Sequence, residues 1–430
     1  MEKVLPKGWV ETELGSIFNL VYGKGISTKE LISGDFEEEL YYNVYGANGI
    51  IGKYSNYTYE KTKVIISCRG AASGVIHKTK PYSFVSSNSI VLDDVSDSLL
   101  NLDFVKYILT AVDKSDIITG TAQPQITIQL LQYLKIPFPP LAEQERIVAK
   151  LDALFAQHEI MKKALDRIPQ LLKNFRQQVL TQAVTGKLTE EWREGKDLEE
   201  WKIEKALDCC DKVQSGGTPK GSNFSLEGIP FLKVYNIVNN KIDFDSEPQF
   251  VSEEIHNTQI KKSIAYPGDV IMNIVGPPLN KVAIITDQYA EWNLNQAITI
   301  FRVGSSLDKK FLYYYFCEGS SVKSLGHDLR GVVGQANISL SQCRNFDIPI
   351  PPLAEQQEIV SRVESFFAKS DAIEAIYTNL KKKIDSLPQA LLHKAFKGEL
   401  VPQLPTDGDA KDLLAEIMAL KKEVKRKKKN

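Results

Sequence analysis

The stretch Ile136-Pro-Phe-Pro-Pro-Leu-Ala-Glu-Gln-Glu-Arg-Ile-Val148 occurs twice in this chain. The second copy, Ile348-Pro-Ile-Pro-Pro-Leu-Ala-Glu-Gln-Gln-Glu-Ile-Val360, follows 212 residues later and is identical at 10 of 13 positions. The same offset holds without a gap from Gln123/Gln335 to Leu188/Leu400. Chance does not produce a match of this length in 430 residues, so the sequence predicts an internal duplication.

Each copy is expected to open a long helix. The prolines favour an extended lead-in because they cannot continue a strand ladder, and Glu143 complements the dipole at a helix start. Apolar residues then recur at steps of three and four with one three-residue slip, which indicates a coiled coil. The slip gives both copies a polar seam position, His158 and Ser370. We interpret His158 as a tolerated seam residue and not as a catalytic one.

The sequence predicts about 45 residues, or roughly 65 Å, for each helix if it is unbroken. Gly186 and Gly398 are placed to end the helices as C-terminal caps. Pro169 and Pro388 lie at non-equivalent positions, so we expect any kinks to differ. Because neither helix can bury its seam alone, we expect the two helices to pack on each other as an antiparallel pair.

The segments between the copies carry short apolar and aromatic runs bounded by turn residues, which is typical of compact, mostly β domains. Trp9 and Trp201 open the two segments at an offset of 192, so the second domain is expected to be about 20 residues longer. The predicted fold class is α+β: two similar, mixed, mostly β domains joined by two long antiparallel helices. The predicted boundaries are 1–135 and 189–347 for the domains, 136–188 and 348–402 for the helical segments, and 403–430 for a charged tail.

Composition bounds the possible classes of protein. The net charge of −1 argues against an indiscriminate nucleic-acid binder, although a local basic groove is compatible with it. There is no apolar run of about 18 residues and no signal-like N-terminus, so we expect a cytoplasmic protein without a membrane span. The five cysteines and five histidines show no metal-ligand spacing. The basic tail, Lys421 to Asn430, is interpreted as a solvated, frayed end, with loose phosphate contact as the alternative.

Taken together, these features are similar to those of one known family. The doubled pattern comprises a Trp-initiated variable domain, a Gln-containing turn (Gln123-Pro-Gln-Ile-Thr and Gln335-Ala-Asn-Ile-Ser), and Ile-Pro-x-Pro-Pro-Leu-Ala-Glu-Gln with a long helix. It resembles the specificity subunit of Type I restriction–modification enzymes over essentially the whole chain. The resemblance implies that each variable domain is a target recognition domain that reads one half of a split, asymmetric sequence in double-stranded DNA.

The resemblance also implies the partners. The paired helices would set the spacer between the half-sites and dock two modification subunits, which carry S-adenosylmethionine and methylate adenine. Restriction subunits would add translocation and cleavage driven by ATP and Mg²⁺, and this subunit itself would hold no cofactor. Docking is expected on the outward faces of 141–184 and 353–396 and at the helix starts, at Pro139, Pro140, Leu141, Glu143, Gln144, Pro351, Pro352, Leu353, Glu355 and Gln356.

Candidate DNA-contacting residues are polar loop side chains, because Lys and Arg neutralise phosphates and Asn, Gln, Arg and Ser reach base edges. In the first domain they are Lys24, Arg69, Ser73, Lys78, Lys80 and Gln123. In the second domain they are Lys220, Lys233, Asn236, Lys281, Asn295, Arg330 and Gln335.

The chain carries no recognisable catalytic constellation. It has no Walker motif, and Gly276-Pro-Pro-Leu lacks the Asn and the aromatic residue of a methyltransferase motif. We therefore expect a non-catalytic subunit. The main alternative is a coiled-coil scaffold whose domains bind proteins without reading DNA, and a fused enzyme is disfavoured by the missing motifs.

Overall fold

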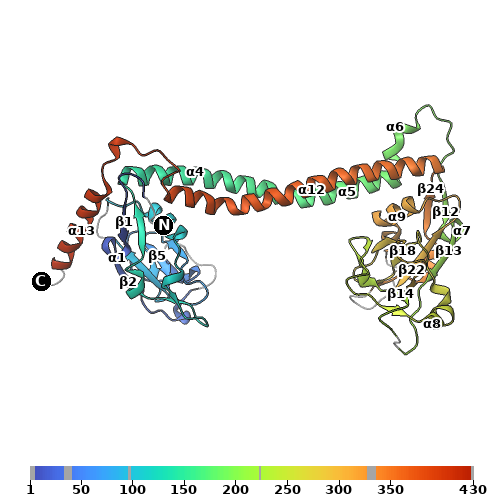
Figure 1. Cartoon of the computed structure of the whole chain (residues 1–430), viewed down its shortest axis with the longest axis horizontal. Helices are drawn as coiled ribbons and strands as arrows, with labels where there is room; N and C mark the ends of the chain where they lie inside the picture. The colour runs from blue at the N-terminus through green and yellow to red at the C-terminus, as the bar shows by residue number, and fades with distance from the viewer. Residues whose placement is uncertain (1–4, 33–40, 95–97, 222–223, 327–335, 428–430) are drawn as a thin grey trace. The chain divides into compact units, whose positions relative to one another are not determined.

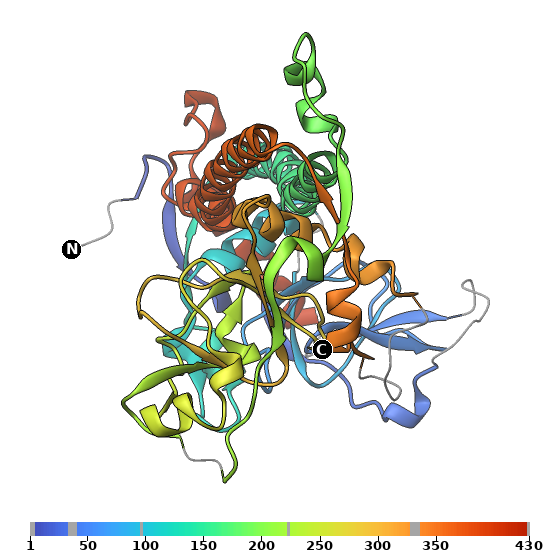
Figure 2. The ribbon, with the colours of Figure 1, turned by 90° about the vertical axis from the view of Figure 1, so that its right-hand side faces the viewer.

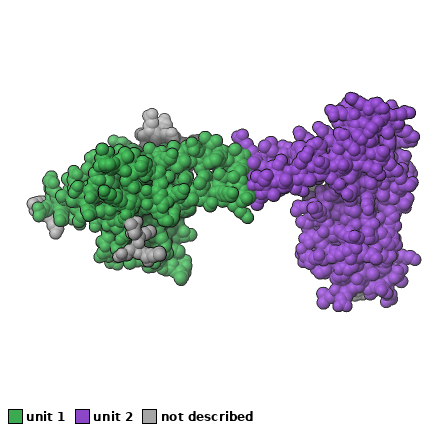
Figure 3. All heavy atoms as spheres, turned by 45° about the horizontal axis from the view of Figure 1, so that its top comes forward, with its two compact units in different colours: residues 1–166, 379–430 green, residues 167–378 purple. Residues whose placement is uncertain are grey.

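The computed structural model describes residues 5–32, 41–94, 98–221, 224–326 and 336–427 (Figure 1). The chain divides into two compact units, coloured separately in Figure 3. Unit 1 comprises residues 1–166 and 379–430, and unit 2 comprises residues 167–378. Each unit therefore contains one mixed domain and a portion of both long helical segments.

Unit 1 is built on a four-stranded antiparallel sheet with the order β2-β8-β5-β6. A three-stranded sheet, β4-β3-β7, lies beside it, and β1 pairs with β11. The strands are β1 (Val10–Glu13), β2 (Asn19–Tyr22), β3 (Tyr42–Gly46), β4 (Gly49–Tyr54), β5 (Val64–Ser67), β6 (Ile76–Lys78), β7 (Phe84–Val85), β8 (Ser89–Asp93), β9 (Ile118–Thr119), β10 (Gln125–Ile126) and β11 (Lys135–Phe138). The helices of the domain are α1 (Leu14–Ile17), η1 (Thr28–Glu30), α2 (Leu102–Ala111), η3 (Ser115–Ile117) and α3 (Ile128–Leu131).

Unit 2 repeats this topology with the strand orders β13-β22-β18-β20 and β17-β14-β21, and with β12 paired to β24. Its strands are β12 (Lys202–Lys205), β13 (Cys210–Ser215), β14 (Ile229–Leu232), β15 (Ile237–Val238), β16 (Lys241–Ile242), β17 (Phe250–Val251), β18 (Val270–Asn273), β19 (Val275–Gly276), β20 (Val282–Ile284), β21 (Asn293–Leu294), β22 (Ile298–Val303), β23 (Ala336–Asn337) and β24 (Asp347–Ile350). Its helices are η4 (Lys187–Thr189), α6 (Glu190–Arg193), α7 (Ala206–Cys209), η5 (Val234–Asn236), α8 (Glu253–Asn257), η6 (Lys261–Ser263), α9 (Lys309–Glu318), α10 (Ser320–Lys323) and α11 (Leu340–Arg344). Helix α6 stands apart from the sheets of this unit (Figure 2).

The core of each unit lies between its sheet and one amphipathic helix. In unit 1 the central strand β5 is buried along its whole length, and α2 covers it with Phe104 and Ile108. The Asn101 carboxamide caps α2 by accepting from two backbone N–H groups. In unit 2 the same roles fall to β18 and α9, and Asp308 is the cap.

The two long helical segments differ at their prolines: the first is interrupted, and the second alone reaches the length of about 45 residues expected for an unbroken helix. Helix α4 (Leu141–Leu165) ends before α5 (Ile168–Val184), and Pro169 lies in the first turn of α5. Proline lacks the N–H that a continuous helix would donate to the carbonyl of Leu165. Helix α12 (Leu353–Phe396) remains continuous over 44 residues even though Pro388 lies inside it.

The antiparallel pairing of the helical segments is confirmed inside each unit. In unit 1, His158 contacts Ile384 and Asp166 pairs with Lys381. Residue numbers therefore increase along one helical segment in the direction in which they decrease along the other. In unit 2 the same relation joins Arg176 to Glu374 and Leu188 to Arg362. The caps are also confirmed, since Gly186 and Gly398 have φ of +77° and +73°. The predicted fold class, including the internal repeat, is thus the observed one.

The described part of the basic tail, residues 421–427, is helical and not frayed as we expected, although most of its side chains are exposed. Residues Ala410–Lys427 form helix α13, which packs on α1 of unit 1 and buries Ala410 and Ile417 completely. The ammonium group of Lys421 is also buried, where it donates to the carbonyl oxygens of Gly15 and Phe18. These carbonyls lie at the end of α1, where a cation is favourable.

Candidate nucleic-acid interface

Four loops of unit 1 meet at the end of its four-stranded sheet where β2 and β5 finish and β8 begins. We call residues 22–25, 67–70, 85–89 and 123–126 the loop frame of unit 1. Backbone hydrogen bonds of 2.9–3.0 Å join its members: Lys24 N to Val85 O, Ser87 N to Lys24 O, Cys68 N to Asn88 O, Gly70 N to Pro124 O and Ile126 N to Cys68 O. The loops are therefore fixed relative to one another by the main chain.

Unit 2 has an equivalent loop frame, formed by residues 215–218, 273–276, 294–298 and 336–338. Three of its hydrogen bonds, at 2.8–2.9 Å, repeat bonds of unit 1: Gly217 N to Leu294 O, Ile274 N to Ala297 O and Ile338 N to Ile274 O. The pairs Arg69–Gln125 and Val275–Asn337 also form equivalent β-bridges. One backbone arrangement is thus used twice.

Close backbone approach explains a glycine in each frame. A Cβ atom on Gly23 would lie 2.2 Å from the carbonyl oxygen of Ser86. On Gly216 it would lie 2.0 Å from the carbonyl oxygen of Asn295. Real Cβ atoms do not approach backbone oxygens so closely, so both glycines are required by the crossing of the same two loops.

The loop frame of unit 1 contains three of the predicted DNA-contacting residues. Lys24, Arg69 and Gln123 are all exposed there. Ser73 follows directly, and its hydroxyl donates to Pro124 O at 2.7 Å, so it fixes the loop. Burial raises the pKa of the neighbouring Cys68 thiol, which therefore stays protonated inside the frame.

Two other predicted residues of the first domain lie at the opposite end of the β5–β6 hairpin. Lys78 pairs in register with Val64, the first residue of β5, and its ammonium contacts Asp103 at 2.6 Å. The backbone N–H of Lys80 donates to the Tyr45 hydroxyl nearby. The structure does not bring these two lysines into the loop frame.

The predicted residues of the second domain are also dispersed. Asn295 belongs to the loop frame, Lys220 is exposed beside it, Lys233 lies 4.3 Å from the centre of the Phe224 ring, and Lys281 donates to Val234 O. Asn236 is only 1% exposed and holds a turn by bonding the backbone of Lys233, Asp243 and Glu247. Arg330 and Gln335 fall outside the described residues.

Sequence reasoning missed several exposed side chains of the frames and of an adjacent hairpin tip. They are Asn48, Asn88 and Gln125 in unit 1 and Gln296 in unit 2. Asn48 lies beside Ala47, whose carbonyl accepts from the Ser67 hydroxyl. Only Gln125 carried a signal, because it belongs to the repeated Gln-containing turn. The others are ordinary polar residues until the hydrogen bonds place them.

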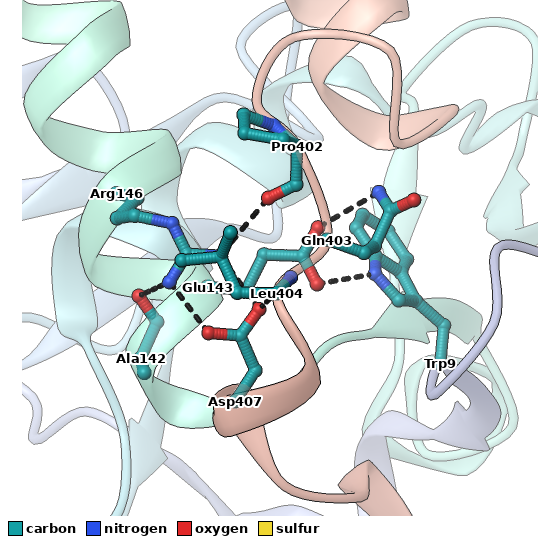
Figure 4. A network of polar contacts seen from close by, with 8 residues as sticks. All are labelled: Trp9, Ala142, Glu143, Arg146, Pro402, Gln403, Leu404 and Asp407. Carbon is teal, nitrogen blue, oxygen red and sulfur yellow. Dashed lines mark hydrogen bonds and ion pairs between the residues drawn. The ribbon is translucent and has the colours of Figure 1, made fainter.

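A second polar centre fixes the mixed domain of unit 1 to α4 (Figure 4). The Glu143 carboxylate, 1% exposed, accepts from Trp9 Nε1 at 2.9 Å and from Gln403 Nε2 at 3.1 Å. One turn later, Arg146 forms a two-pronged ion pair with Asp407, with both distances 2.6 Å. This guanidinium holds the pKa of Asp407 below its usual value. We call this set the junction of unit 1.

The adjacent glutamine completes the junction of unit 1. Gln144 is fully buried, accepts from the backbone N–H of Asn101 at 3.2 Å and donates to Pro139 O at 2.9 Å. Asn101 caps α2, so a single side chain ties the start of α2 to the start of α4.

The junction of unit 2 uses the same pair of residues. Glu355 is fully buried, accepts from Thr189 Oγ1 at 2.7 Å and Trp201 Nε1 at 3.0 Å, and forms an ion pair with Arg193. Gln356 accepts from Asp308 N at 2.7 Å and donates to Pro351 O at 2.8 Å. The repeated Glu-Gln pair therefore has the same internal role in both units.

These contacts bear on the residues expected to dock partner subunits. The side chains of Glu143, Gln144, Glu355 and Gln356 are buried and have partners within the chain, and Pro139, Pro140 and Pro351 are buried as well. Pro352 and Leu141 are half-buried, and Leu353 is 46% exposed. Docking at the helix starts stays a prediction, which rests on the exposed members of the set.

The interpretation of His158 as a seam residue fits its surroundings in unit 1. The ring is buried, and Nε2 lies 2.9 Å from the carbonyl oxygen of Ile384. That carbonyl would normally accept from the N–H four residues later, but Pro388 has none. His158 therefore satisfies a helix carbonyl that the proline leaves free, which requires the tautomer protonated at Nε2.

None of the described His, Cys, Asp and Glu side chains form a group of three or more that could hold a metal ion. Among the described helices, none is both long enough and apolar enough to cross a membrane.

Comparison with known proteins identifies the family that has this doubled architecture. The model of the Type I restriction modification DNA specificity domain matches residues 6–170 and again residues 198–382. This chain belongs to that family. The two matches begin near the two tryptophans of the junctions and extend into the helical segments, so each covers a recognition domain with its adjoining helix.

Named relatives of the DNA specificity family agree with this assignment. The chain is 27% identical to the EcoKI specificity subunit of Escherichia coli (strain K12), over 93% of this chain and 90% of the relative. It is 31% identical to the EcoBI specificity subunit of Escherichia coli, over 65% of this chain and 61% of the relative. The crystal structure of the HsdS subunit from Thermoanaerobacter tengcongensis has the same fold, with a TM-score of 0.63 at 20% identity over 92% of this chain and 98% of that one.

Proposed function

We propose that this family member is the non-catalytic specificity subunit of a Type I restriction–modification enzyme. Each mixed domain reads one half of a bipartite, asymmetric sequence in double-stranded DNA. The observation that carries this proposal is the loop frame, which repeats its backbone hydrogen bonds in both units while its side chains differ. Similar scaffolds with different side chains suit two different half-sites, because base edges are read by side-chain donors and acceptors.

The helical segments set the spacer between the half-sites and dock two modification subunits. An alignment without gaps over the repeated segment supports a ruler whose length matters, since two readers must meet faces of DNA that are accessible together. Apolar side chains also remain exposed along the helices: Ile160 and Met161 in unit 1, and Leu171, Ile373 and Ile376 in unit 2. Exposed apolar groups on a helix are suited to burial against a partner protein.

The chemistry belongs to the partners in this proposal. S-adenosylmethionine is bound by the modification subunits, which methylate adenine, and ATP and Mg²⁺ are used by the restriction subunits. The specificity subunit supplies position, and its place of action is the cytoplasm, where these subunits and the DNA meet.

The test is co-expression with the cognate modification subunit, followed by single-molecule sequencing of methylated host DNA. We expect one split motif with adenine methylation in both halves. Exchange of residues 1–135 for another first domain should change one half only. Absence of any split motif, together with pull-down of proteins by the isolated chain, would instead support a protein-binding scaffold.

A further inference from the structure

The two loop frames present different side chains at equivalent backbone positions. Equivalence is set by the shared hydrogen bonds and β-bridges, independently of sequence identity. By this criterion Arg69 corresponds to Val275, Asn88 to Ala297, and Gln125 to Asn337. Ser87 corresponds likewise to Gln296. These positions differ between the units, whereas the backbone hydrogen bonds named above recur.

Most of the side chains at these positions are exposed to solvent. Arg69, Asn88 and Gln125 are exposed, and within the described part of the chain their side chains make no hydrogen bond. Gln296 is exposed and Val275 is 37% exposed, whereas Asn337 is half-buried and its Oδ1 is buried without a hydrogen-bond partner. By contrast, the backbone groups beneath them are used to join the loops, so that the side chains project from a fixed support.

The chemistry of the two sets differs. A guanidinium fork pairs with the two acceptors of guanine, and a carboxamide pairs with the donor and acceptor of adenine. An apolar side chain suits the methyl group of thymine. At the four positions compared, the frame of unit 1 offers an arginine, a serine and two carboxamides, whereas the frame of unit 2 offers a valine, an alanine and two carboxamides.

We propose that Arg69, Asn88 and Gln125 read the bases of one half-site and that Gln296, Asn337 and Val275 read those of the other. Arg69 recognises a guanine, so the half-site of unit 1 contains a G·C pair whose identity depends on this residue. This inference rests on the proposed function and deepens it by naming the positions that specify sequence.

The test uses the complex with the modification subunit and a pool of duplexes that carry the wild-type motif with one position randomised at a time. Base preference is read by sequencing the bound and the methylated fractions. Arg69→Lys keeps the charge and removes the fork, so we expect the preference at one G·C position to fall by about tenfold or more, with the other half unchanged. Gln296→Ala should relax the other half only.

Lys135→Ala is the matched control. It removes a cation from an exposed residue of unit 1 that pairs with Glu11 on β1, outside the loop frame. The base preference of the Lys135→Ala complex should equal that of the wild type at every position of the motif. Binding to the pool also reports preference for variants that methylate slowly, so loss of turnover does not hide the result.

The outcomes separate this inference from the function on which it rests. If the wild-type complex selects no split sequence, the proposed function fails. If the wild type selects a split sequence and Arg69→Lys and Gln296→Ala keep it unchanged, the function stands and the assignment of these positions is wrong. Relaxation of both halves by either single variant would also overturn the assignment, because it would indicate a general loss of binding.

Discussion

The junctions of the two units hold the same buried glutamate in different ways. In unit 1 the carboxylate of Glu143 accepts from two neutral donors, the Trp9 indole and the Gln403 carboxamide. In unit 2 the carboxylate of Glu355 accepts from the Trp201 indole and the Thr189 hydroxyl, and an arginine is added. The glutamate and the tryptophan are repeated, whereas the other partners of the glutamate are not.

In each unit, the partners that differ come from the residues that follow the opposite helical segment, the one that does not carry the glutamate. Residues after α12 return to Glu143, and residues after α5 return to Glu355. An arginine of the helix also reaches a carbonyl of the returning segment, Arg146 to Pro402 and Arg362 to Leu188. The repeated Glu-Gln pair is buried and needs hydrogen-bond partners, and different donors complete it in the two units.

The largest difference between the junctions is expected from loss of the glutamate. Glu355→Ala leaves Arg193 without its carboxylate in a partly buried site, and we expect unit 2 to lose roughly 3–5 kcal/mol of stability. Glu143→Ala leaves only neutral donors unpaired, and we expect a loss of roughly 2–3 kcal/mol in unit 1. Hydrogen exchange read by mass spectrometry assigns each loss to its unit, which a whole-chain melt would mix.

Glu→Gln at each position is the control for these variants. It keeps the shape and one of the two acceptor oxygens, so Glu143→Gln should lose less stability than Glu143→Ala, and Glu355→Gln should still weaken the pairing with Arg193. Equal losses for the two alanine variants, or a larger loss at Glu143, would contradict the view that the arginine distinguishes the junctions.

Helix α13 packs on α1 of unit 1, and Lys421 tests how much this contact contributes to stability. Lys421→Met keeps the apolar stem but leaves the carbonyls of Gly15 and Phe18 without their charged donor. We expect the free energy of unfolding of unit 1 to fall by roughly 1.5–3 kcal/mol, with no change in unit 2. Exchange of the amides of α1 and α13 measures it, and the exposed Lys425→Met is the control. Unchanged exchange would mean that α13 is held by Ala410 and Ile417 alone.

The seam position shared by His158 and Ser370 gives a smaller contrast. His158→Ala removes the donor to the Ile384 carbonyl, and we expect a loss of roughly 1–2 kcal/mol because a buried acceptor is left unpaired. Pro388→Ala would restore an N–H for that carbonyl, so the double variant should lose less than the sum of the single effects. Ser370→Ala should be nearly neutral, since its buried hydroxyl oxygen has no hydrogen-bond partner. A loss at Ser370 equal to that at His158 would contradict this account.

The sequence predicted the repeat, the antiparallel pairing and the glycine caps because these depend on patterns along one chain. It could not predict that Pro169 interrupts one helix while Pro388 leaves the other continuous. That outcome depends partly on a histidine 230 residues away in the sequence. The loop frames were missed for the same reason: Asn88 and Gln125 become neighbours only through the backbone of Cys68. Long-range hydrogen bonds leave no periodicity that a sequence pattern can reveal.

The smallest expected effect is a pH dependence peculiar to the junction of unit 1. Arg146 holds the pKa of Asp407 below its unfolded value, so the ion pair stabilises unit 1 above a pH of about 4. This contribution is lost as the pH falls through the lower folded value. Because Arg146 is partly exposed, we expect the ion pair to contribute less than about 1 kcal/mol to the stability of unit 1.

At the position equivalent to Arg146, unit 2 has Glu358, which pairs with Arg362 on its own helix. Acid should therefore speed proteolysis near residues 402–407 in the wild type and have little further effect in Asp407→Asn. An identical acid response in that variant would show that another group controls the release.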